Sequence, residues 1–132
     1  MEERAAPVAR AEGAALVGGV PALDAQFGNV WTDIDETLFA TLQPEFGDRF
    51  RVTIARDGTT VFTGELPYVR AFGEVPEGQP LLYLNSLLNV SFALNLGNFA
   101  AAHGIRAGGE WTVRLERAAP IRPEAAPAAG GR

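Results

Sequence analysis

A short segment of the chain carries three side chains that are suited to binding a planar ligand: residues 27–34, with the sequence FGNVWTDI. Because side chains two residues apart point to the same face of a β-strand, Asn29, Trp31 and Asp33 lie together if this segment is extended. An asparagine amide can donate and accept hydrogen bonds along the edge of a base, and an aromatic ring can stack on its face. The same pattern also fits a polar turn and a half-buried strand whose Trp31 packs in the core. On pattern alone this simpler interpretation is favoured.

Two asparagines end apolar runs further along the chain. Asn85 lies in residues 83–86 (YLNS), and Asn95 lies in residues 93–98 (ALNLGN). Binding residues are often placed on the loops that follow strands. Asparagine and serine also form turns, through hydrogen bonds between their side chains and nearby backbone groups. Without other information the turn interpretation is favoured.

A lone histidine and an acidic cluster are weaker candidates for chemistry. His103 precedes Gly104 at the expected end of a helix, where it would interact with the terminal carbonyls rather than act in catalysis. Asp33, Asp35 and Glu36 could together bind a hard cation, but Asp35 and Glu36 also suit the first turn of a helix. We prefer the helical interpretation and predict no metal site.

The composition of the 132-residue chain excludes several kinds of chemistry. It contains no cysteine and no lysine, which excludes disulfides, thiolate metal ligands, Schiff-base lysines and P-loop lysines. The single histidine excludes a multi-histidine metal centre. A formal net charge of −5 disfavours nucleic acid as a partner, and no run of about 18 apolar residues indicates a membrane span. We therefore expect a globular, cytoplasmic protein without a bound cofactor.

The two ends of the chain differ in composition from its middle. Residues 1–12 and 118–132 are rich in alanine, and the second segment also in proline and glycine, with little apolar periodicity. Such segments bury too little apolar surface to offset the entropy of ordering them. We predict flexible tails over residues 1–12 and 118–132 around one domain formed by residues 13–117.

This domain is predicted to consist mostly of β-structure. Residues 49–56 alternate apolar and polar side chains, and the Asp57-Gly58 pair after them indicates a tight hairpin. Short strands with frequent turns predict an all-β fold, a small closed or partly closed β-barrel with one or two short helices. We expect strands at residues 16–23, 30–34, 49–56, 59–66, 81–85, 90–96 and 110–116, and helices at 35–42 and 98–103.

Four blocks of the sequence, in this order, resemble one protein family. They are similar to the C-terminal domain of the S-adenosylmethionine (SAM) hydroxide adenosyltransferases, a family that also contains the SAM-dependent chlorinase and the fluorinase. The resemblance extends over residues 15–116, nearly the whole predicted domain. The blocks are FGNVWTDI (27–34), GDRFRVTI (47–54), FGEVPEGQPLLYLNS (72–86) and FALNLGNFAAAHGI (92–105).

The resemblance implies a small β-barrel that holds the adenine end of SAM, which is a substrate and not a cofactor. In the family, the site lies between this domain and the larger N-terminal α/β domain of a neighbouring subunit in a trimer. Water or a halide displaces methionine from the ribose 5′ carbon. The expected partners are therefore SAM or adenosine, a separate chain carrying the N-terminal domain, and further copies of this chain in a homotrimer.

The resemblance also implies a set of adenosyl-binding residues. Asn29 falls at the position of the family's adenine-contacting amide, and Trp31 and Phe72 match its aromatic wall. Asn95-Leu96 falls where a backbone group reaches the adenine edge, so the leucine side chain is tolerated there. No catalytic residue is implied within this chain. The complete implied set is Asn29, Trp31, Phe72, Tyr83, Asn85, Ser86, Asn95 and Leu96.

Three departures from the family bear on activity. The resemblance does not include the N-terminal domain, which in the family supplies the ribose-binding carboxylate and positions the water or halide. Leu87-Leu88 stands where many members have Arg-Gly, and Asp33 stands where asparagine is usual. Displacement at a saturated carbon needs a nucleophile that is held in line and partly stripped of water. We therefore expect the chain alone not to turn over SAM, so that its activity as an enzyme depends on a partner.

Two other functions stay open at this stage. A non-catalytic structural or oligomerisation barrel fits Leu87-Leu88, because two apolar residues at the edge of a site can form a protein contact, whereas Asn29 and Trp31 argue against it. A module that binds adenosine or SAM without reaction would release no methionine. The preferred hypothesis is the adenosyl-binding half of a SAM hydroxide adenosyltransferase site, which converts SAM and water to adenosine and L-methionine when another chain completes it.

Overall fold

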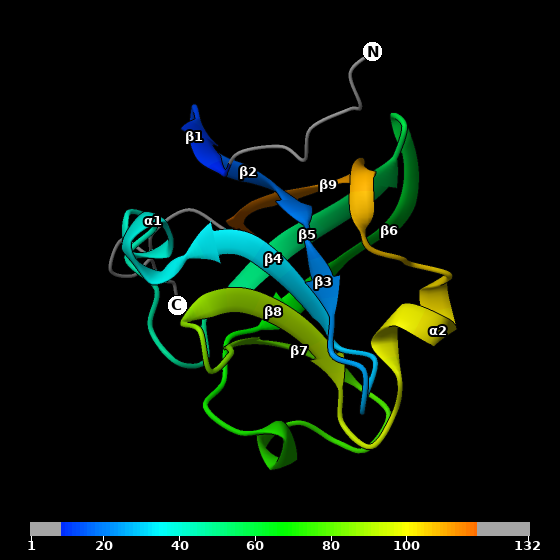
Figure 1. Ribbon diagram of the computed structural model, residues 1–132. Coiled ribbons are helices and arrows are strands. Elements are labelled where there is room, and N and C mark those ends of the chain that lie inside the picture. The colour runs from blue at the N-terminus through cyan, green and yellow to red at the C-terminus, as the bar shows by residue number, and fades with distance from the viewer. Residues whose placement is uncertain (1–8, 119–132) are drawn as a thin grey trace.

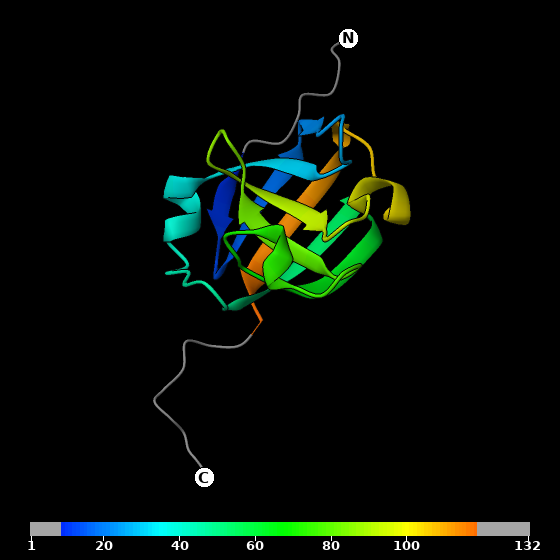
Figure 2. The same cartoon turned by 90° about the horizontal axis from the view of Figure 1, so that it is seen from below.

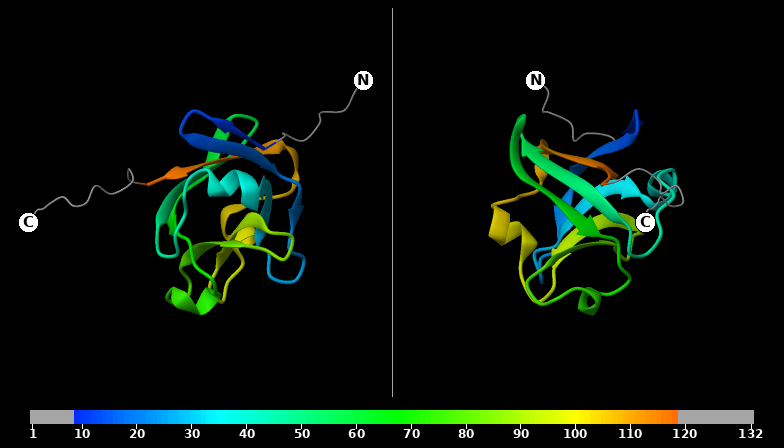
Figure 3. Two further views of the ribbon diagram at one scale, coloured as in Figure 1. Left: turned by 90° about the vertical axis from the view of Figure 1, so that its left-hand side faces the viewer. Right: turned by 180° about the vertical axis from the view of Figure 1, so that it is seen from behind.

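The computed structural model describes residues 9–118, which form two antiparallel β-sheets that enclose one core (Figure 1). Two short helices, α1 (Glu36–Ala40) and α2 (Phe99–His103), lie on opposite sides of the molecule (Figures 1 and 2), and a 3-10 helix, η1 (Phe72–Glu74), lies below β7 (Figure 3). In spatial order, the larger sheet contains β1 (Arg10–Glu12), β2 (Ala15–Val20), β9 (Gly108–Arg117), β5 (Arg49–Arg56) and β6 (Thr59–Pro67). The smaller sheet contains β3 (Ala22–Leu23), β4 (Val30–Asp35), β8 (Asn89–Leu94) and β7 (Pro80–Leu84).

The core between the sheets follows from the alternation of side chains along the strands. In β5, Phe50, Val52 and Ile54 are fully buried, whereas the arginines at either side of Phe50 are exposed. In β4, Val30 and Ile34 are buried in the same core cluster, as the alternation of that strand predicts. The bulkiest fully buried side chains are aromatic: Trp111, Phe39, Phe50, Phe92 and Phe99.

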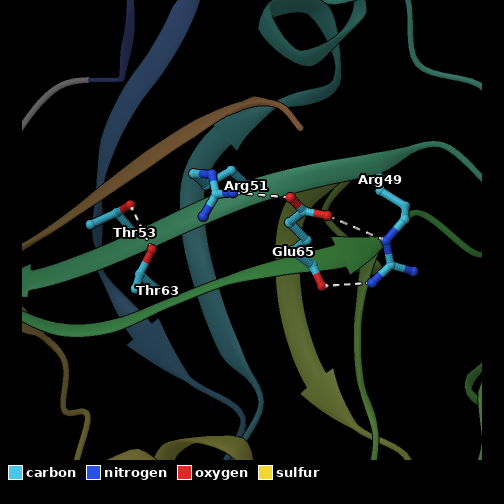
Figure 4. Close-up of polar contacts among 5 residues, drawn as sticks. All are labelled: Arg49, Arg51, Thr53, Thr63 and Glu65. Carbon is cyan, nitrogen blue, oxygen red and sulfur yellow. Dashed lines mark hydrogen bonds and ion pairs between the residues drawn. The ribbon is translucent and has the colours of Figure 1, made fainter. Parts of the chain in front are cut away.

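The outer face of the β5–β6 hairpin is polar, and Figure 4 shows its contacts. Arg51 donates to the Glu65 carboxylate at 2.9 Å, and Arg49 lies 3.8 Å from the same carboxylate. These pairs are exposed, so they contribute little to stability. The hairpin is therefore held mainly by its buried face. The residues drawn in Figure 4 are Arg49, Arg51, Thr53, Thr63 and Glu65.

The predicted hairpin turn and both predicted helices are confirmed. Asp57 and Gly58 have φ angles of 48° and 85°, as in the tight turns that Asp-Gly pairs favour. The helices are shorter than expected: Asp35 caps α1 by accepting from the Leu38 N–H at 2.8 Å, and Gly104 ends α2 with a φ of 67°. Neither helix of the described chain has the length and apolar character needed to cross a membrane.

The expected closed or partly closed barrel is only partly confirmed. The strands form two separate hydrogen-bonded sheets, and these do not close into one continuous barrel. The predicted strand 16–23 is divided at Pro21, so that β2 belongs to the larger sheet and β3 to the smaller. Proline has no N–H to donate and interrupts the strand there. At a second corner, Tyr68 directly after β6 bridges to Leu82 of β7. The fold is therefore all-β, built from two sheets that meet at these corners.

The domain begins earlier than the sequence predicts. Residues 10–12, expected within a flexible tail, form β1 and pair with β2. At the other end, the N–H of Ala118 donates to the carbonyl of Arg49 at 3.1 Å. A short paired segment buries little, so its composition alone does not reveal it. The remainder of both predicted tails, residues 1–8 and 119–132, lies outside the described residues.

Arg117, at the end of β9, holds the loop that follows α1. Its guanidinium donates to the carbonyls of Leu42 at 2.9 Å and Gln43 at 2.5 Å. It also pairs with the Asp48 carboxylate at 3.0 Å. The two side chains of this pair are only 16% and 9% exposed, so water screens them weakly. One side chain thus joins the last strand to a loop that the sequence places far away.

The substitution Arg117→Met should lower the free energy of unfolding by about 2 kcal/mol or more, because it removes the cation beside Asp48 and the donor to two carbonyls. Urea unfolding followed by tryptophan fluorescence measures the change. The matched control Arg106→Met removes an exposed arginine and should change the free energy by less than about 0.5 kcal/mol. Equal losses in the two variants would contradict the role assigned to Arg117.

Candidate functional site

The loop before β4 places Asn29 at the start of that strand. The Asp24 N–H donates to the Asn29 carbonyl at 2.9 Å, and the Gly28 N–H donates to the Asp24 carbonyl at 2.7 Å, so the loop closes on itself. Gly28 has a φ of 74°, and a Cβ there would overlap the Asn98 side chain. The Gly28 carbonyl accepts from the Ala100 N–H at 3.0 Å. Glycine is therefore required at this position, and α2 holds the loop in place.

The side-chain amide of Asn29 is buried and only half satisfied. The residue is 2% exposed, and its Nδ2 donates to the Tyr83 hydroxyl at 2.9 Å and to the Asp24 carboxylate at 3.4 Å. Its Oδ1 is buried without a hydrogen-bond partner among the described residues. A buried acceptor left unpaired costs about 1–3 kcal/mol. This oxygen is therefore an atom that a donor from a ligand or a water would stabilise.

Trp31, Ser91 and Tyr83 form a row across three neighbouring strands. Trp31 of β4 pairs in register with Ser91 of β8, and Ser91 pairs in register with Tyr83 of β7. Directly paired residues share a face of the sheet, so the three side chains project from the face opposite the core. Within the described chain the Trp31 Nε1 atom is buried and forms no hydrogen bond. The row adds an aromatic surface and a second unsatisfied polar atom to the site.

Tyr83 connects the amide of Asn29 to the aromatic residues. Its ring packs edge-on against Phe72 of η1, with the ring centroids 5.1 Å apart, and its hydroxyl accepts from Asn29. Burial raises the pKa of the Tyr83 hydroxyl above the usual value of 10.0, while the hydrogen bond from the Asn29 amide opposes that rise. The hydroxyl is therefore neutral at physiological pH and can both donate and accept.

Asn85 shapes the turn between β7 and β8, as the turn interpretation of its sequence predicts. Its Oδ1 accepts from the N–H groups of Leu87 at 2.8 Å and Asn89 at 3.2 Å. Its Nδ2 donates to the Ser91 hydroxyl at 2.8 Å. Most of the hydrogen-bonding capacity of Asn85 is thus used within the chain. Its bond to Ser91 holds the middle member of the row in place. Ser86 is exposed in the same turn.

Asn95 and Leu96 follow the opposite end of β8. The Asn95 side chain donates to the Val75 carbonyl at 2.9 Å, and its backbone N–H donates to the Gln79 carbonyl at 3.0 Å. A backbone donor for a ligand would therefore have to come from Leu96, which is 78% exposed with a φ of 59°. The six residues of β8 span about 20 Å. A ligand that reaches both Ser86 and Leu96 must be longer than a single base.

The structure brings four of the eight predicted residues into one cluster and spreads the others along the β7–β8 hairpin. Two members of the network were not predicted, Ser91 and Asp24. A serine alternating with Asn89 in an otherwise apolar strand was the available signal for Ser91. An aspartate at the start of the turn that leads to Gly28 was the signal for Asp24. The four clustered residues are Asn29, Trp31, Phe72 and Tyr83.

The weaker candidates have structural roles. Asp33 accepts from the Gly19 N–H at 2.8 Å and so ties β4 to β2, and Asp35 caps α1. In the described part of the chain, no three histidine or acidic side chains are grouped so that they could hold a metal ion. The His103 ring packs on Phe62 with the centroids 4.6 Å apart.

The sequence of this two-sheet domain matches a known family. A profile of the SAM hydroxide adenosyltransferase C-terminal domain aligns with residues 18–112. The chain belongs to this family. The aligned segment contains the loop before β4, the turn of β7 and β8, and η1, so every predicted site residue of this SAM hydroxide adenosyltransferase C-terminal domain lies within it.

Curated relatives of this family member are fluorinases. The fluorinase of Nocardia brasiliensis is 36% identical over 94 residues, which are 70% of this chain and 30% of that protein. The fluorinase of Actinopolyspora mzabensis is 31% identical over 103 residues, which are 77% of this chain and 32% of that protein. The chain thus spans about a third of the length of these relatives.

Two solved structures of longer chains contain a similar domain. An uncharacterized conserved protein from Thermotoga maritima superposes with a TM-score of 0.74 at 28% identity, over 88% of this chain and 41% of that chain. A conserved hypothetical protein from Thermus thermophilus superposes with a TM-score of 0.52 at 33% identity, over 83% of this chain and 37% of that chain.

The turn between β7 and β8 should gain stability from the substitution Leu88→Gly. Leu88 has a φ of 63°, a conformation that costs a residue with a Cβ about 1–2 kcal/mol. Relief of this strain exceeds the added entropy of glycine in the unfolded chain, so the free energy of unfolding should rise by up to about 1 kcal/mol. Urea unfolding measures it. The neighbouring Leu87→Gly relieves no such strain and should lower stability; equal losses in both would contradict the prediction.

The two tyrosines of the chain should ionise above pH 10 in the folded state. Burial raises the pKa of both Tyr68 and Tyr83 above the usual 10.0. A folded pKa above the unfolded value means that folding favours the neutral tyrosine. The contribution of these tyrosines to the free energy of unfolding is therefore fully present below pH 10 and is lost as the pH rises through the folded pKa values. Tyrosinate absorbance should show fewer than half of the tyrosines ionised at pH 10 before unfolding. Half-ionisation of the folded chain at that pH would disprove the shift.

Proposed function

We propose that this chain supplies the adenosyl-binding half of a SAM hydroxide adenosyltransferase site, and that an N-terminal domain of another chain completes it. The proposed reaction converts SAM and water to adenosine and L-methionine, with SAM as the substrate and no resident cofactor. Membership of the family supports this reaction class, since its description names hydroxide. The name of the fluorinase relatives makes fluoride the alternative nucleophile.

The observation that carries the proposal is the unpartnered Oδ1 of Asn29. This buried oxygen lacks a donor within the described chain, and the amino group of adenine is a donor on the edge of a flat ring. The match between an unmet acceptor and such a donor favours an adenine over a ligand without a hydrogen-bonding edge. Protein atoms cover the oxygen, so adenine reaches it only with a shift of the surrounding side chains.

The aromatic residues of the cluster support the same ligand. Trp31 and Tyr83 lie in one row on the outer face of the smaller sheet, and Phe72 packs against Tyr83. Stacking of a base on an aromatic ring contributes about 1–3 kcal/mol and does not depend on which base is bound. In this proposal the rings provide affinity, and the Asn29 amide provides recognition of the base.

The chemical step requires groups beyond this cluster. The nucleophile must approach the ribose 5′ carbon in line with the departing methionine and must lose part of its water shell. The clustered residues offer hydrogen-bonding and stacking groups on an outer face, which suits binding and orientation. Because the chain spans about a third of its fluorinase relatives, we assign the positioning of the nucleophile to the part that it does not match.

One observation favours a second candidate function, a structural or oligomerisation module. Leu87 and Leu88 are 66% and 51% exposed in the turn between β7 and β8, and two adjacent exposed leucines are typical of a protein contact. In this alternative the unsatisfied Asn29 amide would hold a buried water instead of adenine. The alternative predicts self-association without affinity for nucleosides.

Titration of adenosine into the isotope-labelled chain, followed by amide NMR, tests the proposal. The Asn29→Ala variant should lose the response, because it removes the amide that recognises the base. The matched control Asn89→Ala removes another part-buried amide of the same sheet and should keep it. We expect the shifts to centre on Asn29, Trp31, Phe72 and Leu96.

The outcomes separate the two candidate functions. Shifts that persist in Asn29→Ala would show that adenosine binds elsewhere. If the chain alone does not respond to millimolar adenosine, the titration is repeated with the N-terminal domain of a related fluorinase; a second negative result contradicts the proposal and favours the structural module. With SAM, the completed site should release methionine and adenosine, whereas the chain alone should release neither. If the completed site releases a 5′-halogenated 5′-deoxyadenosine as product instead of adenosine, the nucleophile is halide rather than water.

A further inference from the structure

The amide of Asn29 is compatible with only one orientation beside Asp24. Nδ2 lies 3.4 Å from the Asp24 Oδ2 atom and 2.9 Å from the Tyr83 hydroxyl. A carboxylate accepts hydrogen bonds and does not donate them, whereas a hydroxyl does both. Turning the amide over would place Oδ1 against the carboxylate, which brings two acceptors together. Asp24, and not Tyr83, therefore determines which way the amide faces.

Asp24 is itself held in place by its own loop. Its second carboxylate oxygen accepts from the Gln26 N–H at 3.1 Å. Its backbone N–H donates to the Asn29 carbonyl at 2.9 Å, and its carbonyl accepts from the Gly28 N–H at 2.7 Å. The carboxylate and the amide are thus parts of one closed loop and cannot move apart without breaking these bonds.

We infer that Asp24 is a positioning residue that makes the site selective for a 6-aminopurine over a 6-oxopurine. The inference rests on the proposed function. With Nδ2 turned to Asp24 and Tyr83, the buried Oδ1 is the part of the Asn29 amide left for a ligand. It can accept from the amino group at C6 of adenine, but it repels the carbonyl oxygen at C6 of hypoxanthine. An amide free to turn would offer an N–H to that carbonyl and would not discriminate.

The substitution Asp24→Asn tests the orienting role with little change of shape. The new side chain keeps an oxygen for the Gln26 N–H and presents an NH₂ group to Asn29, which favours the turned amide. Wild-type protein should bind adenosine about tenfold or more tightly than inosine, and the variant should lose at least about fivefold of that preference. The matched control Asp57→Asn lies in the exposed hairpin turn of the larger sheet and should keep it.

The variant Tyr83→Phe separates holding the amide from orienting it. It removes the hydroxyl that accepts from Asn29 but leaves the Asp24 carboxylate. Affinity for both nucleosides should fall, while the ratio between them should stay that of the wild type. A merely structural role of Asp24 would lower both affinities in Asp24→Asn in the same way and would leave the ratio unchanged, which would overturn the inference.

The NMR signals of the Asn29 side-chain amide give a test that needs no ligand. In the full chain they should move in Asp24→Asn and stay in place in Asp57→Asn; signals that do not move in Asp24→Asn overturn the inference. If the signals move in Asp24→Asn but the wild-type protein binds adenosine and inosine equally well, the inferred selectivity is overturned and the proposed function stands. Moved signals with no binding of either nucleoside to the completed site overturn the proposed function, and the inferred selectivity with it.

Discussion

The hydrogen bond from the Asn29 amide to the Tyr83 hydroxyl joins the start of β4 to β7 across the intervening strand β8. The loop before β4 closes by its own backbone hydrogen bonds and is anchored to α2 through the carbonyl of Gly28. Phe72 then packs against the ring that receives the bond. Asn29, Tyr83 and Phe72 are thus linked side chain to side chain. The pairing of β4, β8 and β7 fixes the row on the sheet, and this bond adds the side-chain link between the loop and that row.

The alternation of β-strands allows the smaller sheet to serve two purposes. In β4, Val30 and Ile34 enter the core while Trp31 between them faces the opposite side. The core face is mostly apolar, and its buried hydroxyl, that of Thr32, is satisfied by donating to the Val90 carbonyl at 2.7 Å. The opposite face carries polar atoms whose hydrogen bonds are incomplete within the described residues, including Oδ1 of Asn29. Such unmet groups cost stability, and binding sites are where that cost is commonly tolerated.

Local features of this protein could be predicted, because they depend on neighbours in sequence. The Asp57-Gly58 turn, the cap formed by Asp35 and the end of α2 at Gly104 all lie where the residue types indicate. The turn interpretation of Asn85 is also confirmed by its hydrogen bonds. The barrel was less predictable, since the break at Pro21 shows where a strand ends but not which sheet the next strand joins.

The sequence by itself determined the strands, the turns, the family and the residue types available for a site. Only the tertiary structure decided which of them meet. Asn29 and Tyr83 are 54 residues apart in the chain, and Ser91 enters the network only through the pairing of β8 with its two neighbours. The direction in which the Asn29 amide faces likewise depends on where folding places Asp24. Hydrogen-bond orientation is set by the position of every acceptor in space, which no local pattern of residues specifies.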